Sequence, residues 1–595
     1  MSTAILTGPP APGSSLDGDL RSLGFDVRTA AGPEETGALL AAVPAGERVA
    51  LVDPRFVGHV HALRLALTDP RFPAAAAPGA LTVQNGARPA LARALTTAAG
   101  DDLTGTLADA LDADGVAVHR PQLGTLVATV PADAEARHEA RAAVEAVDDE
   151  AVRLRSAVKA HDGFFTTFFI SPYSRYIARW CARRGLTPNQ VTTASLLTAL
   201  IAAGCAATGT RGGYVAAGVL LLVSFVLDCT DGQLARYALK YSTMGAWLDA
   251  TFDRAKEYAF YAGLALGAAR NGDDVWALAL GAMILMTCRH VVDFAFNEAN
   301  AESTGATART SLAVSSRLDS LGWTVWARRM IILPIGERWA MIAVLTAVTT
   351  PRIVFWALIA GCAFGACYTT AGRVLRSLAR RRAKRTDRAA QALADLTDSG
   401  PLAALTHRVL GRTGILMLPP LVLALIATGA LLAAALGRPF GSDQTVVAAV
   451  FYAVFAGAAV ARPLKGALDW LLPPLFRAAE YGTILVLAAR SEVNGALPAA
   501  YGLVAAVAYH HYDTVYRIRG GTGAPPTWLV RTIGGHEGRT LLVTVLAALL
   551  ASRGNDFTLA LTALAVTIAL VVLVESIRFW VSSGAPAVHD EGETA

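Results

Sequence analysis

The chain has 595 residues, of which 54% are hydrophobic and only 17% are charged. Soluble domains carry about 25% charged residues, so this composition excludes a wholly cytosolic enzyme and a disordered or fibrous chain. The formal net charge of +5 is too weak over this length to indicate a nucleic-acid-binding protein.

Residues 1–130 predict a small soluble α/β domain. Short apolar runs at 4–8, 48–53, 79–83, 115–119 and 125–130 predict strands, and the segments 16–24 and 33–43 predict helices between them. The charged, alanine-rich segment 131–158 contains no glycine and predicts a helical linker that leaves this domain. The first residues lack a basic segment followed by an apolar core, which predicts a cytoplasmic N-terminus without a signal peptide.

Hydrophobic stretches dominate the rest of the chain. A membrane-spanning helix needs about 20 mostly apolar residues, and twelve stretches predict such helices. They lie at 190–209, 213–235, 246–268, 274–297, 337–350, 352–372, 414–436, 445–461, 469–489, 495–512, 537–552 and 555–578. The loops after the second, fourth and sixth stretches are rich in Arg and Lys, whereas those after the first, third and fifth are short and hold or border one Arg each. This charge pattern predicts a multi-pass protein of the cell membrane with both termini and the inner loops on the cytoplasmic side.

The expected fold is therefore mainly α, with about twelve transmembrane helices and a small α/β domain at the N-terminus. Six helices fall in a first membrane domain at 159–378, and six more fall in a second at 411–595. A basic cytoplasmic linker at 379–410 divides the two groups.

A cluster of aspartates begins at the end of the second predicted span. The sequence DCTDGQLAR occupies 228–236, and GAWLDATFD occupies 245–253. Helical spacing places Asp228 and Asp231 on one face, and Asp249 and Asp253 on another. Two adjacent helices would aim these carboxylates into one cavity, where two Mg²⁺ or Mn²⁺ ions would offset their repulsion. The alternatives are a proton relay in a transporter and carboxylates that cap helix ends.

The pattern D-x-x-D-G-x-x-A-R-x(8)-G-x-x-x-D-x-x-x-D resembles the signature of the CDP-alcohol phosphotransferase family at every fixed position. The resemblance covers roughly 159–378. It implies a six-helix membrane domain that transfers a phosphoalcohol group from a CDP-alcohol to a hydroxyl acceptor and releases CMP. It further implies that Asp228, Asp231, Asp249 and Asp253 bind two Mg²⁺ or Mn²⁺ ions, and that Asp253 also serves as the catalytic general base.

The resemblance also implies a nucleotide pocket on the same helices. TPNQVT at 187–192 matches the family's T-P-N-x-x-T stretch, which places Thr187, Pro188 and Asn189 beside the nucleotide together with Asp228. Gly232, Ala235 and Gly245 would leave space for the cytidine and pyrophosphate. Arg236 would face a phosphate or steady the carboxylates.

Two features bear on the substrates. KAHDGFF at 159–165 and SPYSRYI at 171–177 are similar to an amphipathic helix of the inositol-phosphate-using branch, in which an upstream nucleotidyltransferase domain often makes CDP-inositol. Here the loop at 8–13 reads GPPAPG, and prolines cannot offer a row of N–H groups to a triphosphate. This loop predicts a degenerate, non-catalytic α/β domain. Two alternatives to a CDP-inositol-using enzyme stay open. One is a synthase of the phosphatidylglycerophosphate or phosphatidylinositol-phosphate type that uses CDP-diacylglycerol. The other, from a different class, is a transporter or flippase.

Tryptophans and arginines alternate between the fourth and fifth predicted spans, which is typical of an interfacial helix. Arg328, Arg329 or Arg338 would contact an acceptor phosphate there or anchor the chain at the membrane surface. The expected partners are a CDP-alcohol, a hydroxyl acceptor and the lipid bilayer, and the chain is also a candidate homodimer.

The second membrane domain shows no motif that assigns a function. Arg477 and Glu480, three residues apart, predict a buried ion pair. Arg517, His536 and Arg539 are candidates for an anion site at the inner surface. The alternatives are helix packing with membrane-surface anchoring and a worn duplicate of the first six helices.

Overall fold

The computed structural model of the chain describes residues 2–98, 100–159, 162–300, 333–379, 385–410 and 418–582. The chain divides into two compact units. The first contains residues 1–161, 171–191 and 229–242, and the second contains 162–170, 192–228 and 243–595.

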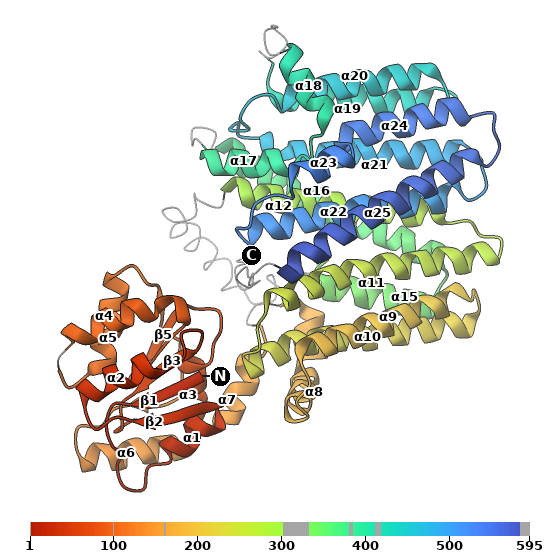
Figure 1. The fold of residues 1–595 in the computed structure, drawn as a ribbon. Coiled ribbons are helices and arrows are strands. Elements are labelled where there is room, and N and C mark those ends of the chain that lie inside the picture. Colours follow the sequence, from red (N-terminus) through yellow and green to blue (C-terminus); the bar gives the residue numbers. More distant parts are fainter. Residues whose placement is uncertain are drawn as a thin grey trace. The chain divides into compact units, whose positions relative to one another are not determined.

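The α/β region is built on a six-stranded sheet with the order β2-β1-β3-β6-β5-β7 (Figure 1). β1 (Ser2–Leu6) runs parallel to β2 (Phe25–Thr29) and β3 (Arg48–Val52), with Ser2 in register with Phe25 and Arg48. β6 (Ala80–Val83) pairs antiparallel with β3 and β5 (Ala74–Ala77), and β7 (Val118–His119) forms the edge. The short strands β4 (Val57–Gly58) and β8 (Ala128–Thr129) form a separate antiparallel pair.

Helices cover both faces of this sheet (Figure 1). Alternate side chains of a strand point to opposite faces, so a strand buried on both sides is apolar throughout. Ile5 packs with α2 (Pro33–Ala42), α4 (Arg88–Thr97) and α5 (Leu103–Ala113). Ala4 and Leu6 pack on the other face with α1 (Leu16–Ser22) and α3 (Val60–Leu67).

Three predicted strands correspond to β1, β3 and β6, whereas those at 115–119 and 125–130 shrink to the two-residue strands β7 and β8. The sequence does not predict β2, which carries charged residues, or β5, whose four alanines favour a helix. The linker contains two helices rather than one, α6 (Ala134–Glu145) and α7 (Asp149–Ser156). Asp148 starts the second helix by accepting the N–H of Ala151 at 3.1 Å.

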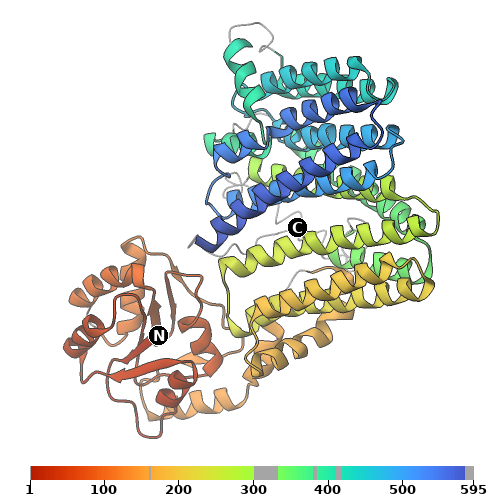
Figure 2. The same ribbon diagram turned by 45° about the vertical axis from the view of Figure 1, so that its right-hand side comes forward.

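The chain beyond the α/β region is helical. A π-helical turn at Thr166–Ile170 precedes α8 (Ser171–Arg183), α9 (Pro188–Ala207), α10 (Arg211–Ala238), α11 (Thr243–Arg270), α12 (Trp276–Asn300), α15 (Ile335–Val348) and α16 (Pro351–Ala379). The later helices are α17 (Asp387–Leu396), α18 (Pro401–Leu410), α19 (Pro420–Gly437), α20 (Asp443–Ala459), α21 (Leu472–Arg490), α22 (Ala496–Arg519), α23 (Thr527–Thr532), α24 (Gly535–Leu550) and α25 (Asp556–Ser582). In the second unit, pairs such as α19 and α20, or α22 and α25, run side by side (Figures 1 and 2).

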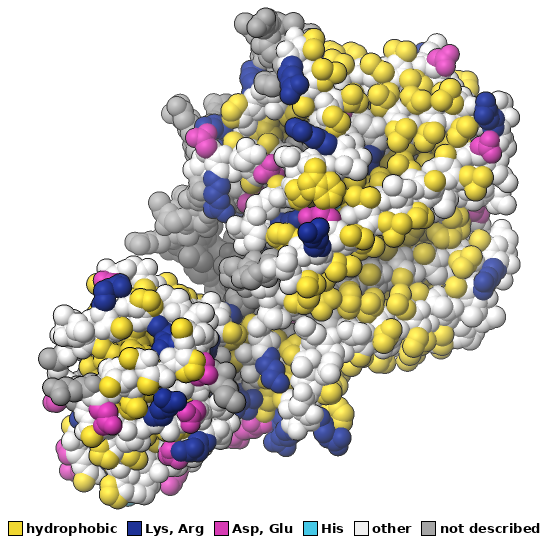
Figure 3. All heavy atoms as spheres, viewed as in Figure 1, with side chains coloured by type: hydrophobic (Ala, Val, Ile, Leu, Met, Phe, Trp, Pro, Cys, Tyr) yellow, Lys and Arg dark blue, Asp and Glu magenta, His cyan; other side chains and the backbone are white. Residues whose placement is uncertain are grey.

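Eight helical segments in the described part of the chain are long and apolar enough to cross a membrane. They are α9, α10, α12, α16, α19, the segments Asp469–Arg490 and Thr527–Leu550, and α25. Each of the twelve predicted spans overlaps a helix, but α15 and α20 have only 14 and 17 residues. α11 carries six charged side chains, and the last ten residues of α22 are largely polar. Hydrophobic side chains gather on the outer surface of the helices (Figure 3), as lipid-facing helices require.

Candidate active site

The site forms where α10 and α11 meet in the chain. α10 ends at Ala238, after which Leu239 adopts a φ of 51° and the N–H of Lys240 donates to the carbonyl of Ala235 at 3.0 Å. This closure is typical of a helix C-terminus. Because α11 begins at Thr243, a short loop joins the two helices that carry the aspartates.

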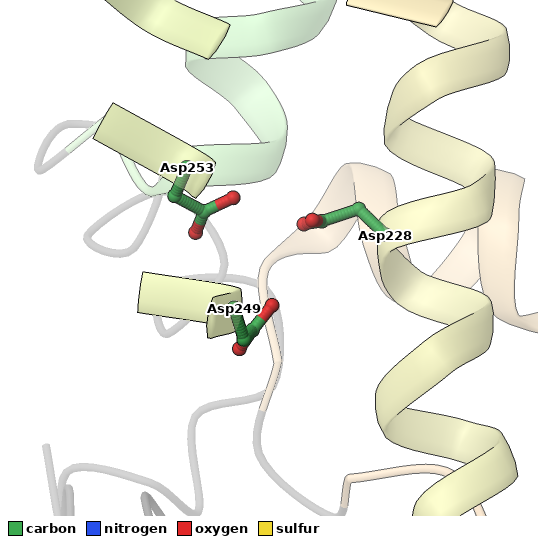
Figure 4. A group of neighbouring side chains, drawn as sticks. All are labelled: Asp228, Asp249 and Asp253. Carbon is green, nitrogen blue, oxygen red and sulfur yellow. The ribbon is translucent and has the colours of Figure 1, made fainter. Parts of the chain in front are cut away.

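Three of the four predicted carboxylates converge. Asp228 points from α10 toward Asp249 and Asp253 on α11 (Figure 4), and one carboxylate oxygen from each residue lies within 4.8 Å of the other two. All three side chains are half-buried. Asp231, one turn later on α10, does not belong to this group of three, and its role as a ligand stays a prediction.

Lys256 enters the same cluster, and the motif did not reveal it. Its ammonium contacts the carboxylate of Asp228, lies 2.9 Å from Oδ1 of Asp253, and donates to Oγ of Ser195 at 3.2 Å. The Lys256 side chain is only 2% exposed. Spacing could have identified it, because positions 249, 253 and 256 follow one face of a helix.

These residues fit a divalent cation. Carboxylate oxygens are the ligands that Mg²⁺ and Mn²⁺ prefer, and three of them meet at one half-buried point. One lysine offsets only part of the three negative charges, so a bound cation would stabilise the cluster further. Asp228, Asp249 and Asp253 are therefore the residues that would hold a metal ion.

The predicted nucleotide residues lie at the ends of α9, α10 and α11. Thr187 caps α9, where its N–H donates to Oε1 of Gln190 and its Oγ1 accepts the N–H of Gln190. At Gly232 an added Cβ would lie 3.4 Å from Nη1 of Arg236, so a larger side chain would press on that guanidinium. Arg236 itself donates through Nε to the carbonyl of Ala157 at 2.6 Å. Its predicted contact with a phosphate stays a prediction, as do those of Ala235 and Gly245.

A cavity of about 530 Å³ lies within the first unit. Thr187, Pro188 and Asn189 line it together with Lys240 and with residues of the α/β region such as Arg48. The T-P-N stretch therefore borders an open space of ligand size.

Of the three predicted acceptor residues, the structure describes Arg338, which lies in the first turn of α15. Arg328 and Arg329 lie outside the described residues. Arg338 is 3% exposed, and its Nε lies 3.4 Å from Oε1 of Glu257. Glu257 also contacts Nη1 of Arg254 at 2.6 Å. An acceptor phosphate would have to compete with this carboxylate for Arg338.

The C-terminal arginines have carboxylate partners. The predicted pair of Arg477 and Glu480 is confirmed at 2.9 Å, with both side chains fully buried. Arg539 contacts Glu480 and Asp398, each at 2.6 Å, so two guanidinium groups face two carboxylates.

Arg517 likewise contacts Asp513 at 2.8 Å and Glu575 at 2.6 Å. His536 stacks on Phe476 and hydrogen-bonds to Tyr452 at 2.7 Å. These contacts favour the alternative of helix packing, and the anion site at Arg517, His536 and Arg539 stays a prediction. Buried arginines are neutralised by the nearest carboxylates, which leaves little charge for a further anion.

Two family models match the chain. Residues 185–367 match CDP-alcohol phosphatidyltransferase, and residues 387–595 match a family of unknown function, DUF5941. The chain therefore contains a CDP-alcohol phosphatidyltransferase domain followed by a DUF5941 domain, and the predicted enzyme family of the first membrane domain is confirmed. It is a multi-pass membrane protein. The two matches leave the N-terminal α/β region without an assignment.

Several curated proteins are similar to part of the chain. The archaetidylinositol phosphate synthase of Pyrococcus horikoshii is 33% identical over 113 residues, which are 19% of this chain and 58% of that protein. The phosphatidylinositol phosphate synthase of Streptomyces avermitilis is 31% identical over 130 residues, 21% of this chain and 51% of that protein. The bifunctional IPC transferase and DIPP synthase of Aquifex aeolicus is 32% identical over 114 residues, 19% of this chain and 26% of that protein. The chain thus spans about half the length of the first two relatives and a quarter of the third.

Proposed function

We propose that this protein is a metal-dependent CDP-alcohol phosphotransferase. The observation that carries the proposal is the convergence of Asp228, Asp249 and Asp253 within a domain that matches this family. In the reaction, the acceptor hydroxyl oxygen bonds to the β-phosphorus of the CDP-alcohol, and the bond from this phosphorus to the oxygen that links it to CMP breaks. CMP leaves with that oxygen.

Metal binding, proton transfer and nucleotide binding fall to different residues of the domain. Asp228, Asp249 and Asp253 hold up to two Mg²⁺ or Mn²⁺ ions, with Asp231 as a further ligand. Bound metal would neutralise the charge that develops on the departing CMP. Asp253 accepts the proton of the acceptor hydroxyl, and Thr187, Pro188 and Asn189 bind the nucleotide beside the small residues Gly232, Ala235 and Gly245.

The substrates belong to inositol-phosphate lipid synthesis. Three relatives are named for inositol-phosphate lipids or for IPC and DIPP products, which supports this substrate class. The proposal includes two candidate CDP-alcohol donors of the phosphoalcohol group. CDP-inositol agrees with the segments at 159–177, and CDP-diacylglycerol is the alternative.

The proposed topology extends the eight candidate spans to twelve by adding α11, α15, α20 and α22. The site then faces the cytoplasm with both termini, because the arginine-rich loops lie on that side. In this topology α11 and α22 bury their charged side chains inside the bundle rather than in lipid.

The test is CMP release by the purified protein. We expect release that requires Mg²⁺ or Mn²⁺ and stops with EDTA, for one pair from a panel of CDP-inositol or CDP-diacylglycerol with inositol or inositol phosphate acceptors. Asp228→Asn and Asp249→Asn should abolish release, whereas Asp443→Asn, at an exposed position that begins α20, should not. A folded wild-type protein that releases no CMP with any pair would contradict the proposal and favour a transporter.

A further inference from the structure

α11 presents two opposite faces. Successive helical residues turn by about 100°, so Asp249, Asp253 and Lys256 lie along one face. Trp247, Arg254 and Tyr258 lie along another, about 160° away. These last three side chains are 8%, 8% and 9% exposed, although they are large and one is charged.

Helices of the C-terminal domain cover the second face. The rings of Trp247 and Trp580 on α25 stack with centroids 6.3 Å apart. The guanidinium of Arg254 lies 5.4 Å from the ring centroid of Tyr512 on α22. Contacts of α11 with both α22 and α25 thus flank the two aspartates in sequence, two residues before Asp249 and one residue after Asp253.

A third contact fixes α11 along its axis. The hydroxyl of Tyr501 on α22 donates to the backbone carbonyl of Tyr258 at 2.8 Å. A bond to backbone does not depend on side-chain rotamers, so it sets the position of α11 relative to α22 directly.

The covering residues are themselves held by buried polar contacts. Nε1 of Trp580 donates to Oδ1 of Asp513 at 2.7 Å, and Oδ2 of Asp513 lies 2.8 Å from Nε of Arg517. Arg517 in turn donates to both carboxylate oxygens of Glu575. The Tyr512 hydroxyl hydrogen-bonds to Nδ1 of His290 on α12. These contacts leave little freedom to the surface against which α11 packs.

We propose that the DUF5941 domain, residues 387–595, is a positioning element for the transfer reaction. Its helices α22 and α25 hold the rotation and axial position of α11, so that Asp249 and Asp253 face Asp228. The three carboxylates come from α10 and α11 alone, so the C-terminal domain acts through the placement of α11. Tyr512 and Trp580 are positioning residues, not catalytic ones. This inference rests on the proposed function.

Small displacements of a catalytic group have large effects. A misplacement of about 1 Å can reduce a rate by about 100-fold, and residues that orient metal ligands typically contribute about 10- to 100-fold to metal affinity. Loss of the α11 contacts should therefore lower kcat and weaken metal binding, with little change in the KM of the nucleotide donor.

The experiment measures kcat, the KM of the CDP-alcohol and the Kd of Mn²⁺ by titration calorimetry in detergent. Tyr512→Leu and Trp580→Leu should each lower kcat by about 10-fold or more and raise the Kd of Mn²⁺ by about 10-fold. Tyr512→Phe keeps the ring over Arg254 and should recover most of both losses. Trp528→Leu, at a tryptophan of the same domain that is 53% exposed, is the matched control and should behave as wild type.

Tyr501→Phe removes a single hydroxyl and provides a milder variant if either leucine variant does not fold. It should lower kcat by about threefold, as expected for loss of one neutral hydrogen bond. Wild-type kcat and Mn²⁺ affinity in every folded variant of Tyr501, Tyr512 and Trp580 would overturn the inference. Absence of CMP release from wild-type protein would contradict the proposed function instead, and the Mn²⁺ titration would still report whether these residues position the carboxylates.

Discussion

Replacing Lys256 by methionine tests the electrostatics of the aspartate cluster. Methionine keeps the length of the side chain and removes the ammonium that contacts Asp228 and Asp253. The lysine is 2% exposed and the two carboxylates are 15% and 18% exposed, so the cluster is shielded from water. Removing one partner of a buried ion pair costs about 3–5 kcal/mol, and we expect the metal-free protein to lose stability by about that amount.

A divalent cation should return much of this loss. At a Mn²⁺ concentration of about 100 times the Kd of the variant, binding stabilises the folded variant by about 2.7 kcal/mol. The same concentration stabilises wild type by less, because the ammonium of Lys256 competes with the cation for Asp228 and Asp253. Thermal unfolding in detergent, with EDTA and then with Mn²⁺, measures both effects. Lys256→Met should unfold at a lower temperature than wild type in EDTA, and the difference should shrink in Mn²⁺.

Lys465→Met is the matched control. Lys465 pairs with Asp387 at the surface, where the two side chains are 42% and 92% exposed. Exposed pairs of this kind contribute about 0–1 kcal/mol, so this variant should unfold like wild type in both conditions. Equal unfolding temperatures of Lys256→Met and wild type in EDTA would refute the assignment of Lys256 as the cation of the cluster.

Three further predictions concern separate parts of the chain. Asp253→Asn should lower kcat by about 10²- to 10⁴-fold with little change in donor KM, as expected for a general base; loss of Mn²⁺ binding together with activity would make Asp253 mainly a ligand. Deletion of residues 1–150 should leave CMP release from a supplied CDP-alcohol intact, and synthesis of a CDP-alcohol from CTP by the full-length protein would overturn the view of the α/β domain as non-catalytic. Burial, together with nearby Arg153 and Arg64, lowers the pKa of His61 in that domain to about 3. Because the unfolded value is about 6.5, limited proteolysis of the α/β region should accelerate as the pH falls from about 6.5 toward 3, and His61→Leu should reduce this effect.

Sequence spacing predicted the features that repeat with the helical period. The aspartates at 228, 249 and 253 converge because four-residue spacing keeps Asp249 and Asp253 on one face, while a short loop returns the chain beside α10. The same period includes Lys256. Lys256 was not predicted because the family motif ends at Asp253.

Strands of mixed composition were less accessible to prediction. β5 consists of four alanines that favour a helix when considered alone, and tertiary pairing with β6 and β7 makes them extended. β2 carries charged residues and pairs with β1 alone, at the edge of the sheet. Local propensity contains no information on such partners.

The C-terminal arginines show the same limit for charges. A predicted anion site requires guanidinium groups that lack carboxylate partners, and sequence shows a charge without its neighbours. Arg517 pairs with Glu575, 58 residues away in the sequence, and Arg539 pairs with Asp398, 141 residues away. The pairs of Arg477 with Glu480 (i, i+3) and of Arg517 with Asp513 (i, i+4) lie within the range that helical spacing can reveal. The remaining pairs form because helices distant in sequence pack together, and burial then favours mutual neutralisation of their charges over binding of an external anion.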